Sequence, residues 1–323
     1  MVQSAITPVD GLSEYFDTEN SSLNPENRGY TFFVYGTLPI FIIRYLGESL
    51  GQVDYNAITT LGRQISAIFD VFTILILFFI GQRLYNKWVG LLASAFYAFA
   101  VLPIQLSHFA TVDTITNTFA TLAIYAAVWA LTRPVTNPTE DTPEAEIKDD
   151  FSQLDPDQEV DTVDAPTFSW SSIGPWVKEL APYILFGVAL GAATASKINA
   201  AVVALFLPLV ELMRFLRLPK DERQAALWSI MRHLIVAAIL SLLVFRIGQP
   251  YAFKGPGFYN IGINQNWWSS LQSLRAQASG DVDFPPALQW ARRPLTFSGE
   301  NLVKWGLGLP LGILTLLSTL GMG

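Results

Sequence analysis

Three short polar segments interrupt an otherwise apolar sequence, and each holds residue types that could bind or transfer an anionic group. The first is the turn 107–113, which contains His108 and Asp113, with Asn117 one helical turn further along. A carboxylate at a helix start caps free backbone amides, so a cap beside a turn histidine is the plain interpretation. The functional interpretation makes Asp113 and His108 catalytic groups of a polar site at the membrane surface.

The second segment is Lys197, which lies between two apolar runs and is followed by Asn199. A lysine there either extends to the membrane interface or pairs with an anion such as a lipid phosphate. The third is Arg246, which lies three residues before Gln249. Arg246 is either an interfacial anchor or a bidentate phosphate clamp. Two cations and one carboxylate at one membrane depth suit a lipid-phosphate-linked substrate, with Asn117 and Asn199 as further polar contacts.

Other polar residues allow two interpretations each. Asp70 lies inside an apolar run, where it could pair with a basic side chain or make a helix-packing hydrogen bond. Residues 250–299 are rich in Trp, Asn, Gln and Pro, as in NQNWWSSLQ. Their aromatic rings could anchor the chain at the membrane interface or stack on sugar rings.

Cofactor chemistry has few candidate residues. The chain has no Cys and two His, which excludes a zinc-thiolate site and a His-rich metal site. It also lacks the Gly-rich phosphate-binding motifs of nucleotide-binding proteins. The sequence therefore predicts no particular cofactor. A divalent cation held by a single carboxylate stays an open alternative, and its ligands are unknown.

The composition tells which elements must position these residues. Of the 323 residues, 51% are hydrophobic and 15% are charged, whereas a soluble domain carries about 25% charged residues. Charge-free runs reach the roughly 20 residues that a membrane-spanning helix needs. We predict an all-α, polytopic transmembrane helical bundle of about seven spans plus interfacial helices, with spans at 64–82, 88–106, 114–131, 180–196, 198–215, 233–249 and from 301 onward.

Lys and Arg in the short connections set the orientation, since cytoplasmic loops carry more of them. Arg83, Lys87 and Arg133 mark one side as cytoplasmic, as do five Lys and Arg residues between positions 214 and 232. The net charge of −7 comes from residues 140–164, which hold eleven acidic residues and one Lys. Such a segment cannot bury a core, so we expect a disordered cytoplasmic linker. His108, Asp113, Lys197 and Arg246 then face the non-cytoplasmic side.

The expected organisation has six parts along the chain. They are an outer-face loop with an interfacial helix (1–60), three transmembrane helices (61–133), the acidic linker (134–178), three more transmembrane helices (179–249), an outer-face loop region (250–299) and the start of a further helix (300–323). Under this topology nothing in the first part would carry it across the membrane. The chain is therefore expected to be a fragment that lacks an upstream span and downstream helices.

Several motifs together resemble one enzyme superfamily. They are YFDTENSSLNP with FFVYGTLPIF, LGRQISAIFDVFTILILFFIGQRLY, PIQLSHFATVDTITNTFATLA, GVALGAATASKINAAV, FRIGQPYAF, PPALQWARRP and NLVKWGLGLPLG. In this order they resemble the GT-C glycosyltransferases, in particular the polyprenyl-phosphate-sugar-dependent branch related to protein O-mannosyltransferases and aminoarabinose transferases. The resemblance covers nearly the whole chain apart from the acidic segment.

The resemblance implies a reaction and its partners. A sugar would pass from a polyprenyl-phosphate carrier to a protein, lipid or glycan acceptor on the outer face of the plasma membrane, without nucleic acid. Asp113 matches an outer-loop aspartate of the family and Lys197 a lysine near the lipid phosphate, while Arg246 would be an additional phosphate contact. Holding the leaving phosphate by positive charge is a major catalytic term.

One departure from the family pattern affects the catalytic base. The family's acidic residue normally belongs to an Asp-Glu pair in the loop after the first helix, but the only such dipeptide here is Asp221-Glu222, on the expected cytoplasmic side. The resemblance therefore implies that the chain could lack this base and be inactive alone. Two other functions stay open: a transporter or flippase, which Asp70 would suit, and a non-catalytic membrane protein.

Overall fold

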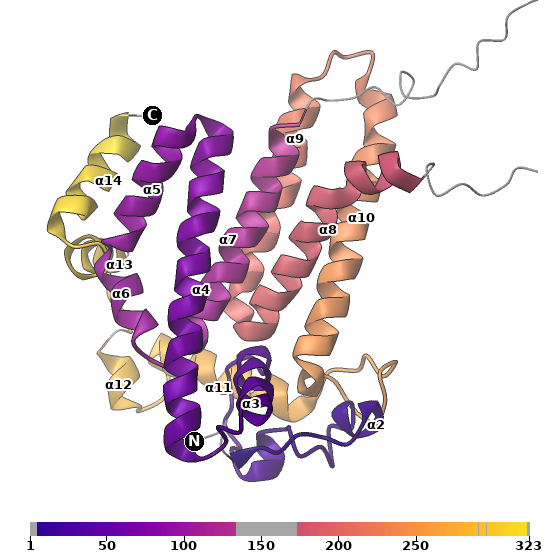
Figure 1. Ribbon diagram of the computed structural model, residues 1–323, viewed down its shortest axis with the longest axis vertical. Helices are drawn as coiled ribbons and strands as arrows, with labels where there is room; N and C mark the ends of the chain where they lie inside the picture. The colour runs from indigo at the N-terminus through magenta and orange to yellow at the C-terminus, as the bar shows by residue number, and fades with distance from the viewer. Residues whose placement is uncertain (1–4, 134–172, 290, 295, 322–323) are drawn as a thin grey trace, which may run out of the picture.

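The fold is a bundle of long helices capped at one end by shorter ones (Figure 1). The computed structural model describes residues 5–133 and 173–321, apart from positions 290 and 295. Over these ranges the chain forms helices, turns and one isolated β-bridge between Phe253 and Ile263. Most of the acidic segment expected at 134–178 lies outside the described residues. The all-α class predicted from the sequence is confirmed.

The long helices run side by side along the longest axis of the molecule (Figure 1). Five are long and apolar enough to cross a membrane: α4 (Tyr55–Leu84), α7 (Val112–Leu131), α8 (Ile173–Ser196, of which Val177–Ser196 qualify), η3 with α9 (Ile198–Leu205 and Phe206–Arg217) and α10 (Arg223–Gly248). Short helices α2 (Leu12–Tyr15), α3 (Leu38–Ser49), α11 (Gln265–Ser279) and α12 (Pro285–Leu288) gather at one end. The chain is thus a multi-pass membrane protein.

Three helices begin earlier than expected; α10, expected from residue 233, begins at Arg223. Asp54 accepts hydrogen bonds from the backbone N–H groups of Asn56 and Ala57, at 3.0 and 3.1 Å, so α4 begins at Tyr55. The boundary expected after residue 60 therefore falls inside this helix. Helix α8 already begins at Ile173, so the boundary expected after 178 also falls inside a helix.

The second expected span, 88–106, is broken. It consists of α5 (Lys87–Ala98) and α6 (Val101–Ser107), which meet at an angle of 63°. Pro103 explains the break, because a continuous helix would need its missing N–H to bond the carbonyl of Phe99, against which its ring would also clash. The pair counts as a sixth span only if the two helices are taken together.

The last apolar run, 301–321, is expected to begin a further span, but it is not one continuous helix. It divides into a π-helical turn, Leu302–Gly306, and α14 (Leu309–Gly321), after α13 (Thr296–Asn301). Gly308 has a φ of 82°, which ends the first helix, and Pro310 then opens α14. At 13 residues and a rise of about 1.5 Å per residue, α14 is too short to cross a bilayer.

The core lies where α7, α8 and α10 pack. Alanines of α7 at 123, 126, 127 and 130 meet Tyr183 and Phe186 of α8 with almost no exposed surface. Helix α8 approaches α10 through Gly187 and Gly191: a Cβ at either position would lie 2.5 Å from a backbone carbonyl oxygen of α10. Small residues four apart allow backbones to approach this closely between membrane helices.

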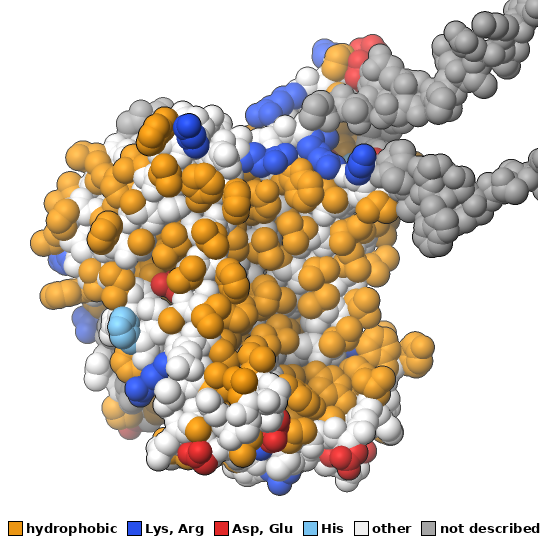
Figure 2. Space-filling model, in the orientation of Figure 1, with side chains coloured by type: hydrophobic (Ala, Val, Ile, Leu, Met, Phe, Trp, Pro, Cys, Tyr) orange, Lys and Arg blue, Asp and Glu red, His pale blue; other side chains and the backbone are white. Residues whose placement is uncertain are grey.

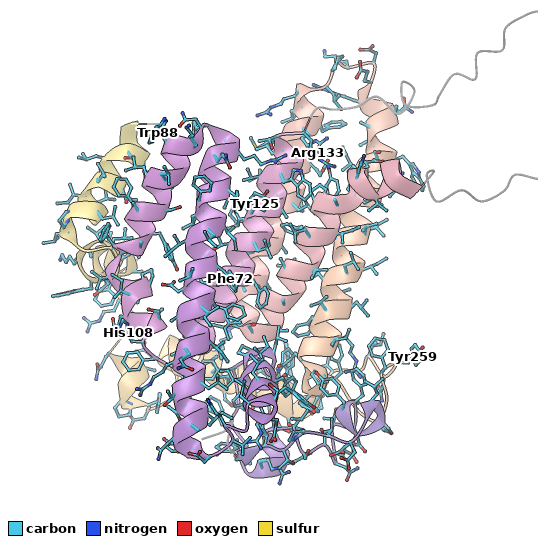
Figure 3. The ribbon with its side chains drawn as sticks, in the orientation of Figure 1. Phe72, Trp88, His108, Tyr125, Arg133 and Tyr259 are labelled. Carbon is cyan, nitrogen blue, oxygen red and sulfur yellow. The ribbon has the colours of Figure 1, made fainter. Side chains whose placement is uncertain are left out.

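The two ends of the bundle differ in chemistry. Figure 2 shows a belt of hydrophobic side chains around the middle and a concentration of Lys and Arg at one end. We call this the basic end; Arg133 and Trp88 lie there, while His108 and Tyr259 lie at the opposite end (Figure 3). We call the opposite end, where α4 and α7 begin, the site end.

Candidate functional site

The centre of the candidate site is an ion pair between two helix ends. The Nζ atom of Lys197 donates to Oδ1 of Asp113 at 2.7 Å. Lys197 joins α8 to η3, and Asp113 lies in the first turn of α7, so the two residues are 84 positions apart in sequence. Both side chains are 34% exposed. The pair that the sequence predicts to share one membrane depth is therefore in direct contact.

The local backbone explains how Lys197 reaches this position. Its φ and ψ of −157° and 118° are extended, so the chain straightens between two helices and points the side chain away from α8. Residues before α3 cross the end of α8: the N–H of Gly36 donates to the carbonyl of Ser196 at 3.0 Å. A Cβ on Gly36 would lie 1.9 Å from the carbonyl oxygen of Ala195. This contact requires glycine and fixes the residues beside Lys197.

The ion pair leaves binding capacity on both partners. A lysine ammonium group has three donors and a carboxylate has two acceptor oxygens, and one of each is used. Asp113 makes this ion pair, and the first turn of α7 has no side-chain cap bond from its N-cap, Thr111. The negative charge of Asp113 interacts favourably with the positive end of the helix dipole at the start of α7. The arrangement could hold an anion at Nζ while a carboxylate oxygen accepts a proton.

Asn117 takes part in a hydrogen-bond network with Tyr97 and Asp70. Its Nδ2 donates to the hydroxyl oxygen of Tyr97 at 2.8 Å, and that hydroxyl donates to Oδ1 of Asp70 at 2.8 Å. The three residues come from α7, α5 and α4. Of the two roles left open for Asp70, helix-packing hydrogen bonding is the one observed. This hydrogen-bond network holds α5 against α4 and α7, two residues before the helix break.

His108 ends α6 at the site end (Figure 3). Its Nδ1 lies 2.6 Å from the carbonyl oxygen of Ile104. A carbonyl only accepts, so Nδ1 carries the proton and Nε2 is the outward-facing nitrogen. Within the described ranges, no hydrogen bond or ion pair joins His108 to Asp113 or Lys197. The structure therefore shows no contact between His108 and the ion pair among the described residues.

The two remaining candidates differ in exposure. Asn199 is exposed, two residues after Lys197. Arg246 is buried: Nε, Nη1 and Nη2 donate to the carbonyls of Phe258, Pro250 and Gly257 at 3.1, 3.2 and 2.8 Å. Its guanidinium also lies 4.8 Å from the ring centroid of Phe16. These bonds commit Arg246 to the fold of the neighbouring loop, so we leave it out of the phosphate site.

Sequence reasoning missed a contribution from the N-terminal cap, which we define as residues 5–37. The backbone N–H of Thr37 donates to Oε1 of Gln249 at 2.5 Å, and Thr18 donates to the carbonyl of Phe253 at 2.8 Å. Ser21 and Tyr251 share a hydrogen bond of 2.7 Å, and burial raises the pKa of the Tyr251 phenol well above its usual range. The FRIGQPYAF motif was the available signal, because its Gln and Tyr are the cap's partners.

A second charged cluster lies at the basic end. Glu179 accepts from Arg232 and lies 3.2 Å from Nε2 of His233. The other ring nitrogen of His233 faces Glu211 across 3.7 Å, and the ring stacks on Tyr183 at 3.8 Å. Next to this cluster, the guanidinium of Arg133 donates to the carbonyl of Glu179 at 2.9 Å. In the parts of the chain described here, no three His, Cys, Asp or Glu residues form a metal site.

Known proteins resemble the chain in part. Two solved structures from Archaeoglobus fulgidus are similar, both at 15% sequence identity: an oligosaccharyltransferase in complex with Zn and sulfate, with a TM-score of 0.45, and the oligosaccharyltransferase AglB in complex with an inhibitory peptide and a dolichol-phosphate, with a TM-score of 0.46. They cover 88% and 95% of this chain, which spans only 31% and 32% of theirs. No curated protein sequence matches.

A family model gives the more specific match. It is described as dolichyl-phosphate-mannose-protein mannosyltransferase and covers residues 57–137. The matched segment holds α4 to α7, and therefore His108, Asp113 and Asn117 of the candidate site. The resemblance to polyprenyl-phosphate-sugar-dependent glycosyltransferases is thus confirmed, and residues 57–137 carry the pattern of the dolichyl-phosphate-mannose-protein mannosyltransferase family.

Proposed function

We propose that this chain takes part in transferring a sugar from a polyprenyl-phosphate carrier to an acceptor hydroxyl on a protein, lipid or glycan. The contact between Lys197 and Asp113 is the observation that carries the proposal. It sets a cation with spare donors beside a carboxylate with a spare oxygen. Asp113 lies in the segment that matches a mannosyltransferase family, whereas Lys197 lies outside it.

In the proposed reaction the acceptor oxygen attacks the anomeric carbon of the donor sugar. The bond between that carbon and the phosphate oxygen breaks, and its electron pair leaves with the phosphate. Lys197 holds the phosphate and stabilises the charge that develops on it. The acceptor's proton passes to a carboxylate oxygen of Asp113, while His108 and Asn199 line the approach and Asn117 braces α7.

A divalent cation beside Asp113 is a second way to stabilise the phosphate. The single carboxylate supplies little to hold such an ion, whereas Lys197 already supplies a positive charge within 2.7 Å. We therefore propose that the phosphate is held by Lys197 directly. Transfer that persists in EDTA supports this version, and transfer that stops and returns with added Mg²⁺ or Mn²⁺ contradicts it.

The proposed site faces the non-cytoplasmic side of the plasma membrane, because the basic end satisfies the rule that cytoplasmic loops carry more Lys and Arg. The absence of Cys makes this testable by labelling. A membrane-impermeant maleimide should label Ser107→Cys in intact cells. It should label Lys220→Cys, at the basic end, only after permeabilisation. The reverse pattern would place the site on the cytoplasmic side.

The activity test uses the chain reconstituted in vesicles with a short-chain polyprenyl-phosphate mannose. We expect transfer to a hydroxyl acceptor, or slow hydrolysis, that Lys197→Gln and Asp113→Asn each reduce strongly. Arg246→Gln serves as a structural comparison and should lower the stability of the protein. If the unchanged chain neither transfers nor hydrolyses the mannose, the proposal is wrong.

A further inference from the structure

Two arginines at the basic end contact the same tryptophan. The guanidinium of Arg83, in the last turn of α4, lies 5.6 Å from the ring centroid of Trp129, and that of Arg133, just after α7, lies 5.0 Å from it. Cations at this distance are attracted to the indole ring. Nε of Arg83 also donates to the hydroxyl oxygen of Thr132 at 2.7 Å, and Nη1 of Arg133 donates to the carbonyl of Glu179 at 2.9 Å. These contacts hold both guanidinium groups in place, one from each helix.

The positive charge of this pair has no carboxylate partner within residues 5–133 and 173–321. Each guanidinium has five N–H donors and uses one of them in a hydrogen bond to those residues. The nearby carboxylate of Glu179 is already shared by two basic side chains of α10. Burial lowers the pKa of Arg133, and the positive charges of Arg83 and Arg214 lower it further. The pair therefore offers an anion both spare donors and uncompensated charge.

A row of aromatic rings leads from the two arginines into the hydrophobic belt. The ring centroids of Trp129 and Tyr125, both on α7, are 6.4 Å apart, and those of Tyr125 and Phe79 of α4 are also 6.4 Å apart. Tyr125 lies further from the basic end than Arg133 does (Figure 3). Phe79 is 47% exposed and Tyr125 is partly exposed, so this row borders the surface that meets acyl chains in a membrane. A charged end and an apolar track are thus continuous along α4 and α7.

We propose that α4 and α7 bind one anionic phospholipid of the leaflet at the basic end, with its phosphate between Arg83 and Arg133 and an acyl chain along Tyr125 and Phe79. Guanidinium groups bind phosphate oxygens through paired, charge-assisted hydrogen bonds. Basic pockets between membrane helices on the cytoplasmic side bind anionic head groups in this way. A phospholipid uses both the charged end and the apolar track, whereas a free phosphate ion would use only the charged end.

The lipid site and the proposed carrier-phosphate site lie at opposite ends of the bundle. Lys197 pairs with Asp113 at the start of α7, whereas Arg133 follows the end of that helix. A lipid bound at the arginines bridges the ends of α4 and α7, next to the bond between Arg133 and α8. A ligand that binds only the folded protein raises its stability. The unfolding temperature therefore reports on this site without any measurement of sugar transfer.

The test compares three ligands and two arginines of the same end. The delipidated chain in detergent is titrated with phosphatidylglycerol, with phosphatidylcholine of the same acyl chains, or with glycerol 3-phosphate, and bound molecules are counted by native mass spectrometry. We expect one tightly held phosphatidylglycerol. Arg83→Gln should weaken it about fivefold, the usual effect of one basic residue near an anionic lipid surface. Arg217→Gln is the matched control, because it removes an exposed arginine of α9 that does not contact Trp129, and it should leave the affinity nearly unchanged.

Further measurements separate lipid binding from a folding defect and from other occupants. Phosphatidylglycerol should raise the unfolding temperature of Arg217→Gln more than that of Arg83→Gln. Phe79→Ala keeps both arginines and should weaken lipids with long acyl chains more than lipids with short ones.

Three outcomes would overturn the lipid site: equal binding of the two phospholipids, equal effects of the two arginine substitutions, or glycerol 3-phosphate binding as tightly as the lipid. The chain's own acidic residues at 140–164 are the rival occupant. If phosphatidylglycerol binds only after these residues are replaced by their amides, they occupy the arginines and the lipid does not.

Discussion

The two ends of the helix bundle use charged residues in opposite ways. At the site end, one ion pair joins Asp113 to Lys197, and each side chain keeps a third of its surface exposed. At the basic end, Glu179, Glu211, Arg232 and His233 form a cluster across α8, α9 and α10, in which Glu211 and His233 are buried while Glu179 and Arg232 are partly exposed. Exposed pairs contribute little to stability, whereas breaking a buried cluster leaves a charge without compensation.

This difference in exposure suggests a binding role for the pair at the site end and a structural role for the cluster at the basic end. The exposed pair can exchange a partner for a ligand, because water and ligands reach both groups. Glu211 and His233 are buried, so a ligand could reach them only if α9 and α10 moved apart. Helix α8 carries both, with Glu179 and Tyr183 near its start and Lys197 directly after its end. The packed start of α8 thereby positions Lys197, which we propose to hold the phosphate, at its other end.

The largest expected effect is on stability and comes from the basic end. Glu211→Ala should destabilise the protein by about 3–5 kcal/mol, because it leaves His233 and the nearby Arg214 facing an empty position. Thermal unfolding in detergent measures this change. Glu300→Ala is the control, since its pair with Lys304 is more than half exposed and should be worth under about 1 kcal/mol. Equal effects of the two substitutions would contradict the comparison.

At the site end the expected loss is in rate. Lys197→Gln should lower kcat about 10²–10³-fold, the usual consequence of removing one group that stabilises developing charge. The unfolding temperature should stay nearly unchanged, because the ion pair is partly exposed. Measuring both on one preparation is decisive: a large fall in unfolding temperature would make Lys197 a structural residue.

Helix α8 offers a way to disturb the link between the two ends. Gly191→Ala places a Cβ 2.5 Å from the carbonyl oxygen of Ser241, so α8 and α10 must move apart. We expect a loss of about 1–3 kcal/mol in unfolding free energy, as for overpacked cores, together with reduced transfer. Gly299→Ala, whose Cβ would meet nothing within 4 Å, should have neither effect. Unimpaired transfer in the first variant would argue against the link.

The smallest expected effect concerns pH at the site end. The side chain of Asn20 donates to Asp17 at 2.9 Å and lowers the pKa of that carboxyl, helped by the backbone N–H groups of Asn20 and Glu19. A lowered pKa in the folded state adds stability above the ordinary carboxyl pKa, and this is lost as pH falls through the lowered value. Asp17→Asn should remove this slight acid sensitivity of the N-terminal cap. Hydrogen exchange of residues 17–24 against pH would detect it, and an unchanged pH profile in the variant would count against it.

The parts of the fold that sequence predicted well depend on local composition. Apolar runs located the apolar middle of each span, but α4, α8 and α10 begin seven to ten residues before the expected starts. Pro103 and Gly308 break two further runs; both residues were visible signals, but the apolar content around them favoured continuous helices. The capping residue Asp54 likewise marked the start of α4 at Tyr55, nine residues before the start that hydropathy alone suggested.

For the candidate site, sequence could predict only the placement that topology alone determines. Asp113 and Lys197 each lie at a helix end on the same side, so a bundle of antiparallel helices brings them to one level. Arg246 has the same placement, yet its environment depends on Phe16, more than 200 residues away in sequence, and on the loop that wraps around it. No local sequence pattern reveals contacts between residues so far apart.

The bond between Arg133 and the carbonyl of Glu179 has a practical consequence. It ties the end of α7 to the first turns of α8. When the two ends of a connection are held together, a change in its length costs a free energy that grows only with the logarithm of the number of residues. A fluorescent reporter or an affinity tag inserted within residues 134–172 should therefore leave the helices in register.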